Sequence, residues 1–349
     1  MGPELSRTCR ASWMHRPRCH KLGAMTPSLA TSEGGTRSRT VRAKAPGKIN
    51  VSLSVGPLRA DGYHSVASVY LAVSLYEEVS ATSVAGDEIT VSLRQNDAST
   101  LASDAAVPLD ESNLAVRAAR LMADVTEHPT GLHLEIAKRV PVAGGMGGGS
   151  ADAAATLLAC DASWGSGLSR EELAHLAAEL GADVPFALLG GAAVGLGVGD
   201  ELTPALAPGP LHWALVLADF GLSTPTVFTA LDRLRVTKGV EPSEPEGINP
   251  RILQALRSGD AAGLAQVLGN DLQPAALKLA PQLADVIDQG AEYGALASLV
   301  SGSGPTVAML ARDENHAIEL ADRLAEAGQN ALAVHSPVHG AKIVSDLTR

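Results

Sequence analysis

One segment of the sequence is well suited to bind a ligand through its backbone. Residues 141–152 read Pro-Val-Ala-Gly-Gly-Met-Gly-Gly-Gly-Ser-Ala-Asp. Glycines permit positive φ and a close approach of backbone N–H groups to a ligand. A following helix would add unpaired N–H groups and the positive end of its dipole, and this combination suits a phosphate. A glycine cluster can also be only a flexible turn, so the flanking residues decide between the two interpretations.

The loop matches neither of two common nucleotide-binding patterns. No Gly-Lys-Ser/Thr closes it, as a Walker A motif requires, and Ser150 stands where the dinucleotide fingerprint needs its third glycine. Residues 132–136 alternate apolar and polar side chains, which predicts a strand before the loop. Residues 153–160 place small and apolar side chains at helical spacing, which predicts a helix after it.

Two charged residues lie at predicted element ends. Lys48 precedes a strand predicted from the alternation of residues 49–55, where a lysine is usually just solvated. Asp183 follows Gly181, which is expected to end a helix that opens with a Ser-x-x-Glu capping box at residues 169–172. As a lone residue, Asp183 is better explained as a helix cap than as a functional group.

Further polar and aromatic candidates lie in turns. An Asp-Gly turn at residues 59–64 places Tyr63 beside His64, although Tyr63 could simply pack on the surface. Asn113 has the chemistry of a helix cap. A second glycine turn, residues 301–305, lies between two predicted strands.

Composition limits the function classes. The chain has 349 residues, 46% of them hydrophobic, and a net charge of −11, which disfavours a nucleic-acid partner for the body of the protein. No apolar run approaches the length of a membrane span. The three cysteines form no disulfide framework, and Cys9 and Cys19 fit no zinc spacing, so we expect a cytoplasmic protein.

Three segments are expected along the chain. Residues 1–40 show no periodicity and are interpreted as a disordered tail or a start site assigned too early, with Met25 as an alternative; a transit peptide or a nucleic-acid-binding arm is the alternative reading. The Ala-Pro-Gly-Pro turn at residues 207–210 separates two folded parts, 41–207 and 208–349. Both parts alternate strands and helices, which predicts α/β or α+β architecture.

Three separated motifs resemble those of one superfamily, the galactokinase, homoserine kinase, mevalonate kinase and phosphomevalonate kinase (GHMP) group. They are Pro46–Asn50, Pro141–Ala154 and Ser301–Pro305. Asp61–His64 and Leu180–Pro185 further resemble the branch whose kinases act on a cytidyl diphosphate polyol of the non-mevalonate isoprenoid pathway. The resemblance runs from about Val41 to Val344.

The resemblance implies an α+β protein with an N-terminal α/β domain and a C-terminal ferredoxin-like domain. ATP, with Mg²⁺, would donate its γ-phosphoryl to the 2-hydroxyl of the methylerythritol moiety of the substrate. A monomer or weak homodimer is expected, with no nucleic-acid or membrane partner.

The resemblance also assigns roles. Lys48 and Asp183 match the catalytic pair, and Ser150 is the candidate contact for Mg²⁺. The substrate would be held by Asn50, Tyr63, His64 and Phe228. The nucleotide would be held by Pro141, Val142, Ala143, Gly144, Gly145, Met146, Gly147, Gly148, Gly149, Ser150, Ala151 and Asn113.

Some residues depart from the family pattern, and other functions remain open. Ala143 replaces a frequent glycine, Ala151 a second serine and Asp152 a frequent asparagine. Another superfamily kinase, for homoserine or mevalonate, is the main alternative. A non-catalytic nucleotide-binding regulator is disfavoured because Lys48 and Asp183 are both present.

Overall fold

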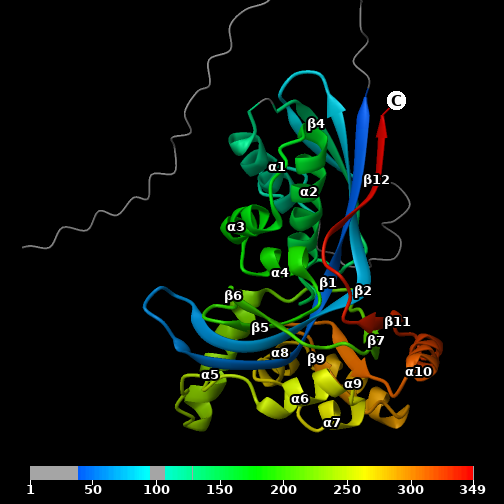
Figure 1. Ribbon diagram of the computed structural model, residues 1–349. Helices are drawn as coiled ribbons and strands as arrows, with labels where there is room; N and C mark the ends of the chain where they lie inside the picture. Colours follow the sequence, from blue (N-terminus) through cyan, green and yellow to red (C-terminus); the bar gives the residue numbers. More distant parts are fainter. Residues whose placement is uncertain (1–37, 95–106, 128, 349) are drawn as a thin grey trace, which may run out of the picture. The chain divides into compact units, whose positions relative to one another are not determined.

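The computed structural model describes residues 38–94, 107–127 and 129–348 (Figure 1). The expected tail falls almost wholly outside these residues, as do Cys9, Cys19 and Met25. The first strand, β1, starts at Arg39 and not near Val41, because Arg39 and Thr40 pair with the last strand, β12 (Lys342–Thr348). Within the described ranges, no helix is long and apolar enough to cross a membrane.

The first of two sheets is built on a long hairpin of β1 and β2. Its strand order is β12-β1-β2-β4-β3, with β5 paired to β2, β6 to β5, and β8 to β1. The pairs β3–β4 and β1–β8 are parallel and the others antiparallel. The bounds are β1 Arg39–Leu58, β2 His64–Val84, β3 Ile89–Leu93, β4 Gly131–Ala137, β5 Ala192–Leu196, β6 Glu201–Ala205 and β8 Gly269–Asn270.

Strand β1 is irregular where Lys48 and Asn50 lie. Its register against β2 shifts between Pro46 and Lys48 and again between Asn50 and Ser52. Proline has no N–H for the ladder, and the Lys48 N–H donates to Met146 O at 2.9 Å. Such bulges bend a strand and redirect its side chains. The predicted strand is therefore confirmed, with a distortion at the residues predicted to act.

Four helices cover one face of this sheet, as Figure 1 shows: α1 (Leu114–Val125), α2 (Gly148–Trp164), α3 (Arg170–Leu180) and α4 (Asp183–Leu189). Asn113 caps α1, and the predicted capping box of Ser169 and Glu172 is present. The alanine-rich α2 is the central helix, because small side chains let it lie close to the sheet. Burial raises the pKa of its Cys160 thiol.

The second sheet has the order β11-β7-β10-β9 and is antiparallel throughout. In chain order this is the 4-1-3-2 arrangement of a ferredoxin-like unit, which confirms the predicted fold class. The strands are β7 Leu211–Val216, β9 Ala297–Val300, β10 Val307–Leu310 and β11 Ala331–Ser336.

Helices and the first sheet cover the two faces of this second sheet. One face packs on α5 (Thr224–Lys238), α8 (Gln273–Leu279), α9 (Gln282–Glu292) and α10 (Glu314–Glu326). The other face, with the buried Trp213, packs on α6 (Pro250–Ser258), α7 (Ala261–Ala265) and side chains of β1 and β2. This apolar contact packs side chains of β1 against those of β9 and β10.

The division of the chain at residue 207 stays a prediction. After β11 the chain returns to the first sheet, where β12 pairs with β1. This strand is longer than the predicted Lys342–Val344, because β1 offers it an unpaired edge along Arg39–Lys44.

Candidate active site

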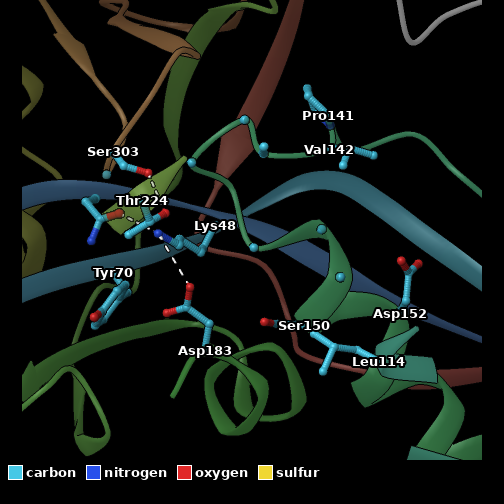
Figure 2. Close-up of a pocket in the computed structure, with 18 of the residues that line it drawn as sticks. Lys48, Tyr70, Leu114, Pro141, Val142, Ser150, Asp152, Asp183, Thr224 and Ser303 are labelled. Carbon is cyan, nitrogen blue, oxygen red and sulfur yellow. Dashed lines mark hydrogen bonds and ion pairs between the residues drawn. The ribbon is translucent and has the colours of Figure 1, made fainter. Parts of the chain in front are cut away.

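The predicted order of strand, glycine loop and helix is present. The loop joins β4 to α2, and Gly147 occupies the cap position of α2 with φ +70°. No side chain caps the helix, so the N–H groups of its first turn are left for another acceptor. Figure 2 shows the loop curving above Ser150 and Asp183.

The second glycine turn holds the first loop in place. Ser301 Oγ donates to Gly145 O at 3.2 Å, and Thr306 N donates to Gly144 O at 3.3 Å. Gly145 has φ +76°, and a Cβ on it would lie 2.1 Å from Ser301 O. The two glycine motifs, far apart in the sequence, therefore pack directly against each other.

Lys48 and Asp183 lie together beside the loop. Lys48 Nζ is 3.8 Å from Asp183 Oδ2 (Figure 2) and 2.6 Å from Asn50 Oδ1, to which it donates. Asn50 Nδ2 in turn donates to Ser68 Oγ at 2.7 Å. The structure thus brings three predicted residues into one connected group, which Ser68 anchors to the sheet.

Three further side chains at this site were not predicted. Tyr70 contacts Lys48 with its ring, 5.6 Å from Nζ to the centroid, and burial followed by the charge of Asp183 raises its pKa. Thr224 and Ser303 share a hydrogen bond of 2.9 Å (Figure 2). Tyr70 sits in a buried strand and reads in sequence as a core residue. Only its position across from Asn50 in the pairing of β1 and β2, with its ring near Lys48, shows its relation to the site.

A buried ion triad links the two ends of the glycine loop. Lys138 Nζ donates to Glu77 Oε1 and to Asp152 Oδ2, each at 2.6 Å. Glu77 also accepts from the backbone N–H groups of Arg139 and Val140 at 2.9 and 3.1 Å. Lys138 and Val140 precede the loop and Asp152 follows it, so Glu77 ties both ends to β2.

Glu77, Lys138 and Asp152 shift one another's pKa values. Burial, and then the charge of Asp152, raise the pKa of Glu77 to about 8, against the attraction of Lys138. Burial alone would lower the pKa of Lys138, but the two carboxylates outweigh it and raise that pKa. Asp152 Oδ1 has no hydrogen-bond partner among the described residues.

A cavity of about 490 Å³ collects most of the predicted residues. Its lining includes Lys48, Asn50, Asn113, Asp183, Phe228, Ser150 and eight further predicted loop positions: Pro141, Val142, Ala143, Gly144, Gly145, Gly147, Gly148 and Gly149. Met146 and Ala151 are fully buried and are not part of the lining. Ala143 adopts φ +52°, a left-handed conformation that a glycine would accept more easily.

The three ring-bearing residues predicted to hold the substrate, Tyr63, His64 and Phe228, are only partly together. His64 and Phe228 contact each other, with ring centroids 4.9 Å apart. Tyr63 is 65% exposed at the hairpin tip and does not line the cavity. Phe228, which was predicted to hold the substrate, lines the cavity.

The protein oxygens near the loop could hold a magnesium ion only together with the oxygens of a bound phosphate and water. No group of three or more acidic, histidine or cysteine side chains that could hold a metal is found in residues 38–94, 107–127 and 129–348. Mg²⁺ usually takes one or two protein oxygens and completes its shell with phosphate oxygens and water. The Ser150 hydroxyl at the cavity is compatible with that pattern.

Fold and site together define a small-molecule kinase of the GHMP class. The chain matches the family described as GHMP kinases N terminal domain over residues 113–191, and GHMP kinases C terminal over residues 252–330. The crystal structure of homoserine kinase from Cytophaga hutchinsonii superposes with a TM-score of 0.65 over 91% of this chain and 100% of that one, at 18% identity. This likeness shows the fold alone.

Closer relatives narrow the class. A 4-diphosphocytidyl-2-C-methyl-D-erythritol kinase of Arthrobacter sp. (strain FB24) is 69% identical over 314 residues, 90% of this chain and 98% of the relative. The kinase of that name from Leifsonia xyli is 54% identical over 309 residues, 88% of this chain and 99% of the relative. A crystal structure of 4-(cytidine 5'-diphospho)-2C-methyl-D-erythritol kinase superposes with a TM-score of 0.69 at 32% identity, over 85% of this chain and 99% of that one. The chain belongs to this family of kinases.

Proposed function

We propose that the chain transfers the γ-phosphoryl group of ATP to the 2-hydroxyl of 4-diphosphocytidyl-2-C-methyl-D-erythritol, in the non-mevalonate isoprenoid pathway. The observation that carries this proposal is the placement of Lys48 and Asp183, 3.8 Å apart, beside a glycine loop that leads into a helix N-terminus. Backbone N–H groups favour a polyphosphate, and a carboxylate with an ammonium favours a hydroxyl acceptor next to it.

Asp183 is proposed to act on the acceptor. Its carboxylate would receive the hydrogen bond of the substrate hydroxyl and take the proton as the new O–P bond forms and the bond to the ADP oxygen breaks. Phosphoryl transfer needs positioning and charge neutralisation more than strong base catalysis. Lys48 would lie between this carboxylate and the γ-phosphate and stabilise the charge in the transition state. Asn50 would hold the Lys48 ammonium at that position.

The nucleotide is proposed to lie along the loop. Pro141–Gly145 and Gly147–Ser150 line the cavity and would surround the triphosphate, with Asn113 toward the nucleoside. Ser150 would contact Mg²⁺, which when bound neutralises charge on the phosphate oxygens. Met146 would act indirectly, since its carbonyl fixes the Lys48 backbone.

The cytosine ring is proposed to bind at the end of the cavity marked by Phe228. Phe228 lines the cavity and His64 contacts it. Tyr63, at the tip of the same hairpin, would have to fold over the ring to stack on it. Stacking between aromatic faces contributes roughly 1–3 kcal/mol per base in comparable sites.

A substrate panel tests the proposal. Purified protein with Mg²⁺ and ATP would be assayed for ADP release with 4-diphosphocytidyl-2-C-methyl-D-erythritol, homoserine and mevalonate. Phosphorylation of the cytidyl compound alone is expected. Turnover of homoserine or mevalonate without the cytidyl compound would select the alternative kinases, and ATP binding without any turnover would select a regulator.

Three further properties are proposed with this function. The protein is expected in the cytoplasm, consistent with the free, buried thiol of Cys160. It is expected to be a monomer or weak homodimer, which sedimentation velocity over a range of concentrations would test. Residues 41–207 and 208–349 are proposed as the two domains of the chain.

A further inference from the structure

Helix α5 holds the His64 side chain on two sides. Phe228 and Asp232 lie four residues apart on this helix and so share one face of it. The Phe228 ring packs on the His64 ring at 4.9 Å with an interplanar angle of 34°. Asp232 places both carboxylate oxygens at the edge of the same ring, 3.0 and 3.1 Å from Nε2. The His64 side chain is 6% exposed and has little freedom to turn.

This contact determines which nitrogen of His64 carries a hydrogen. An ionised carboxylate only accepts hydrogen bonds, so Nε2 must be the donor. In the neutral ring Nδ1 is then an acceptor, because the hydrogen bond at one nitrogen sets the tautomer. Across residues 38–94, 107–127 and 129–348, no hydrogen bond to His64 Nδ1 is found. Nδ1 therefore has no hydrogen-bond partner in the described part of the chain. His64 does not line the cavity itself but packs on Phe228, which does.

The hairpin that carries His64 is fixed to α5 independently. Arg235, one turn beyond Asp232 on α5, donates to Gly56 O at 3.0 Å and to Val55 O. Asp271 accepts from the Val55 N–H at 2.9 Å. These contacts position the hairpin backbone without touching the imidazole. Asp232 is thus not needed to dock the hairpin, and its contact acts on the ring itself.

We propose that Asp232 is a positioning residue that makes His64 a hydrogen-bond acceptor and so selects a pyrimidine with an exocyclic amine. This inference rests on the proposed function. Cytosine presents an N–H₂ donor at the position where uracil presents an oxygen acceptor. His64 Nδ1 would accept a hydrogen bond from the cytosine amine and would be repelled by the uracil oxygen. The Asp232–His64 pair would therefore favour cytidyl over uridyl substrates, while Phe228 would contact either ring alike.

The first experiment measures this discrimination. kcat/KM would be determined for the cytidyl substrate and its uridyl analogue with wild type, Asp232→Ala and Asp232→Asn. Asp232→Ala frees both tautomers, so the cytidyl-to-uridyl ratio is expected to fall by about 10-fold. Asp232→Asn keeps an oxygen that can accept from Nε2 and is expected to retain most of the ratio. The KM for ATP should not change in either variant.

Asp271→Ala is the matched control, because it removes a carboxylate that ties down the same hairpin but does not touch His64. It is expected to leave the cytidyl-to-uridyl ratio at the wild-type value. An unchanged ratio in folded Asp232→Ala, or an equal fall in Asp271→Ala, would overturn the proposal.

Two measurements without turnover separate this inference from the proposed function. Calorimetry with CDP and UDP should show tighter binding of CDP by wild type and a smaller difference in Asp232→Ala. A ¹H–¹⁵N spectrum of the histidine rings, with His64 assigned from the signal lost in His64→Gln, should show hydrogen on Nε2 only. Hydrogen on Nδ1 in wild type would refute the inference even if the kinase activity is present. A wild type that phosphorylates no cytidyl compound yet prefers CDP would refute the proposed function alone.

Discussion

Lys48 Nζ donates to Asn50 Oδ1 at 2.6 Å, a closer contact than its 3.8 Å approach to Asp183. Asn50 therefore sets the position of the ammonium group, and its own amide is oriented by Ser68. This arrangement leaves the Asp183 carboxylate available to a substrate hydroxyl.

Replacement of Asn50 tests this relationship. Asn50→Ala should lower kcat by about 10- to 100-fold, because a hydrogen bond to a buried ammonium is lost. Rates at saturating ATP and cytidyl substrate would measure it. Ser54→Ala, on the same strand but outside the cavity, should retain wild-type kcat. If Asn50→Ala turned over like Ser54→Ala, the lysine would be positioned by other contacts.

The proposed catalytic pair, Lys48 and Asp183, gives a second prediction. Asp183→Ala should lower kcat by about 10²- to 10⁴-fold, and Lys48→Ala by about 10²- to 10³-fold. Each should weaken ATP binding by a much smaller factor, because the loop backbone is proposed to make most of the phosphate contacts. Single-turnover kinetics and nucleotide titration separate the two quantities. Near-normal turnover in either variant would remove that residue from the catalytic step.

Tyr63 gives a third prediction, since it is exposed and outside the cavity. If it folds over the bound base, Tyr63→Ala should raise KM for the cytidyl substrate by about 10-fold and leave KM for ATP unchanged. Tyr63→Phe keeps the aromatic face and should behave like wild type. An equal change in both KM values for Tyr63→Ala would indicate a structural role for the hairpin tip.

The buried triad predicts a pH-dependent stability. The pKa of Glu77 is raised to about 8 by burial and by Asp152, from an ordinary value of 4.5. A carboxyl whose pKa is raised by folding contributes stability below its unfolded pKa and loses it as pH rises through the folded pKa. The free energy of unfolding should therefore fall from about pH 4.5 and level off near pH 8, between the two pKa values.

Asp152→Asn should flatten that fall, because it removes the charge that repels ionised Glu77. Urea unfolding at four pH values between 5 and 8 would measure the slope. Asp161→Asn lies on the same helix away from the triad and should keep the wild-type slope. An unchanged slope in Asp152→Asn would mean that burial, and not the charge of Asp152, raises the pKa of Glu77.

The packing of the two glycine motifs gives a fifth prediction. Gly145→Ala should lower the free energy of unfolding by about 3 kcal/mol, because a Cβ would meet Ser301 O at 2.1 Å and φ is positive. Gly86→Ala shares the positive φ but has open space around it, and should cost about 1 kcal/mol. Equal losses of unfolding free energy in the two variants would show that the two glycine motifs can move apart without destabilising the protein.

Local patterns predicted much of the fold and the site. Alternation and helical spacing identified β4, α2 and the loop between them, because these signals depend on neighbouring residues alone. Helix caps such as Asn113 and Ser169 were predicted for the same reason. Lys48 and Asp183 were found by resemblance, since neither is distinctive by itself.

The tertiary structure decided which of these residues meet. The return of β12 to β1, the contact of Gly145 with Ser301 and the Glu77–Lys138–Asp152 triad join segments far apart in the chain. Nothing in the sequence singled out Asp232, because acidic residues on helix surfaces are common. Only the structure shows that it contacts His64. The sequence by itself determined the elements and the chemical types available, through short-range periodicity and capping. Only the packing of the two sheets determined which side chains share a cavity, because such contacts depend on distances that no local pattern encodes.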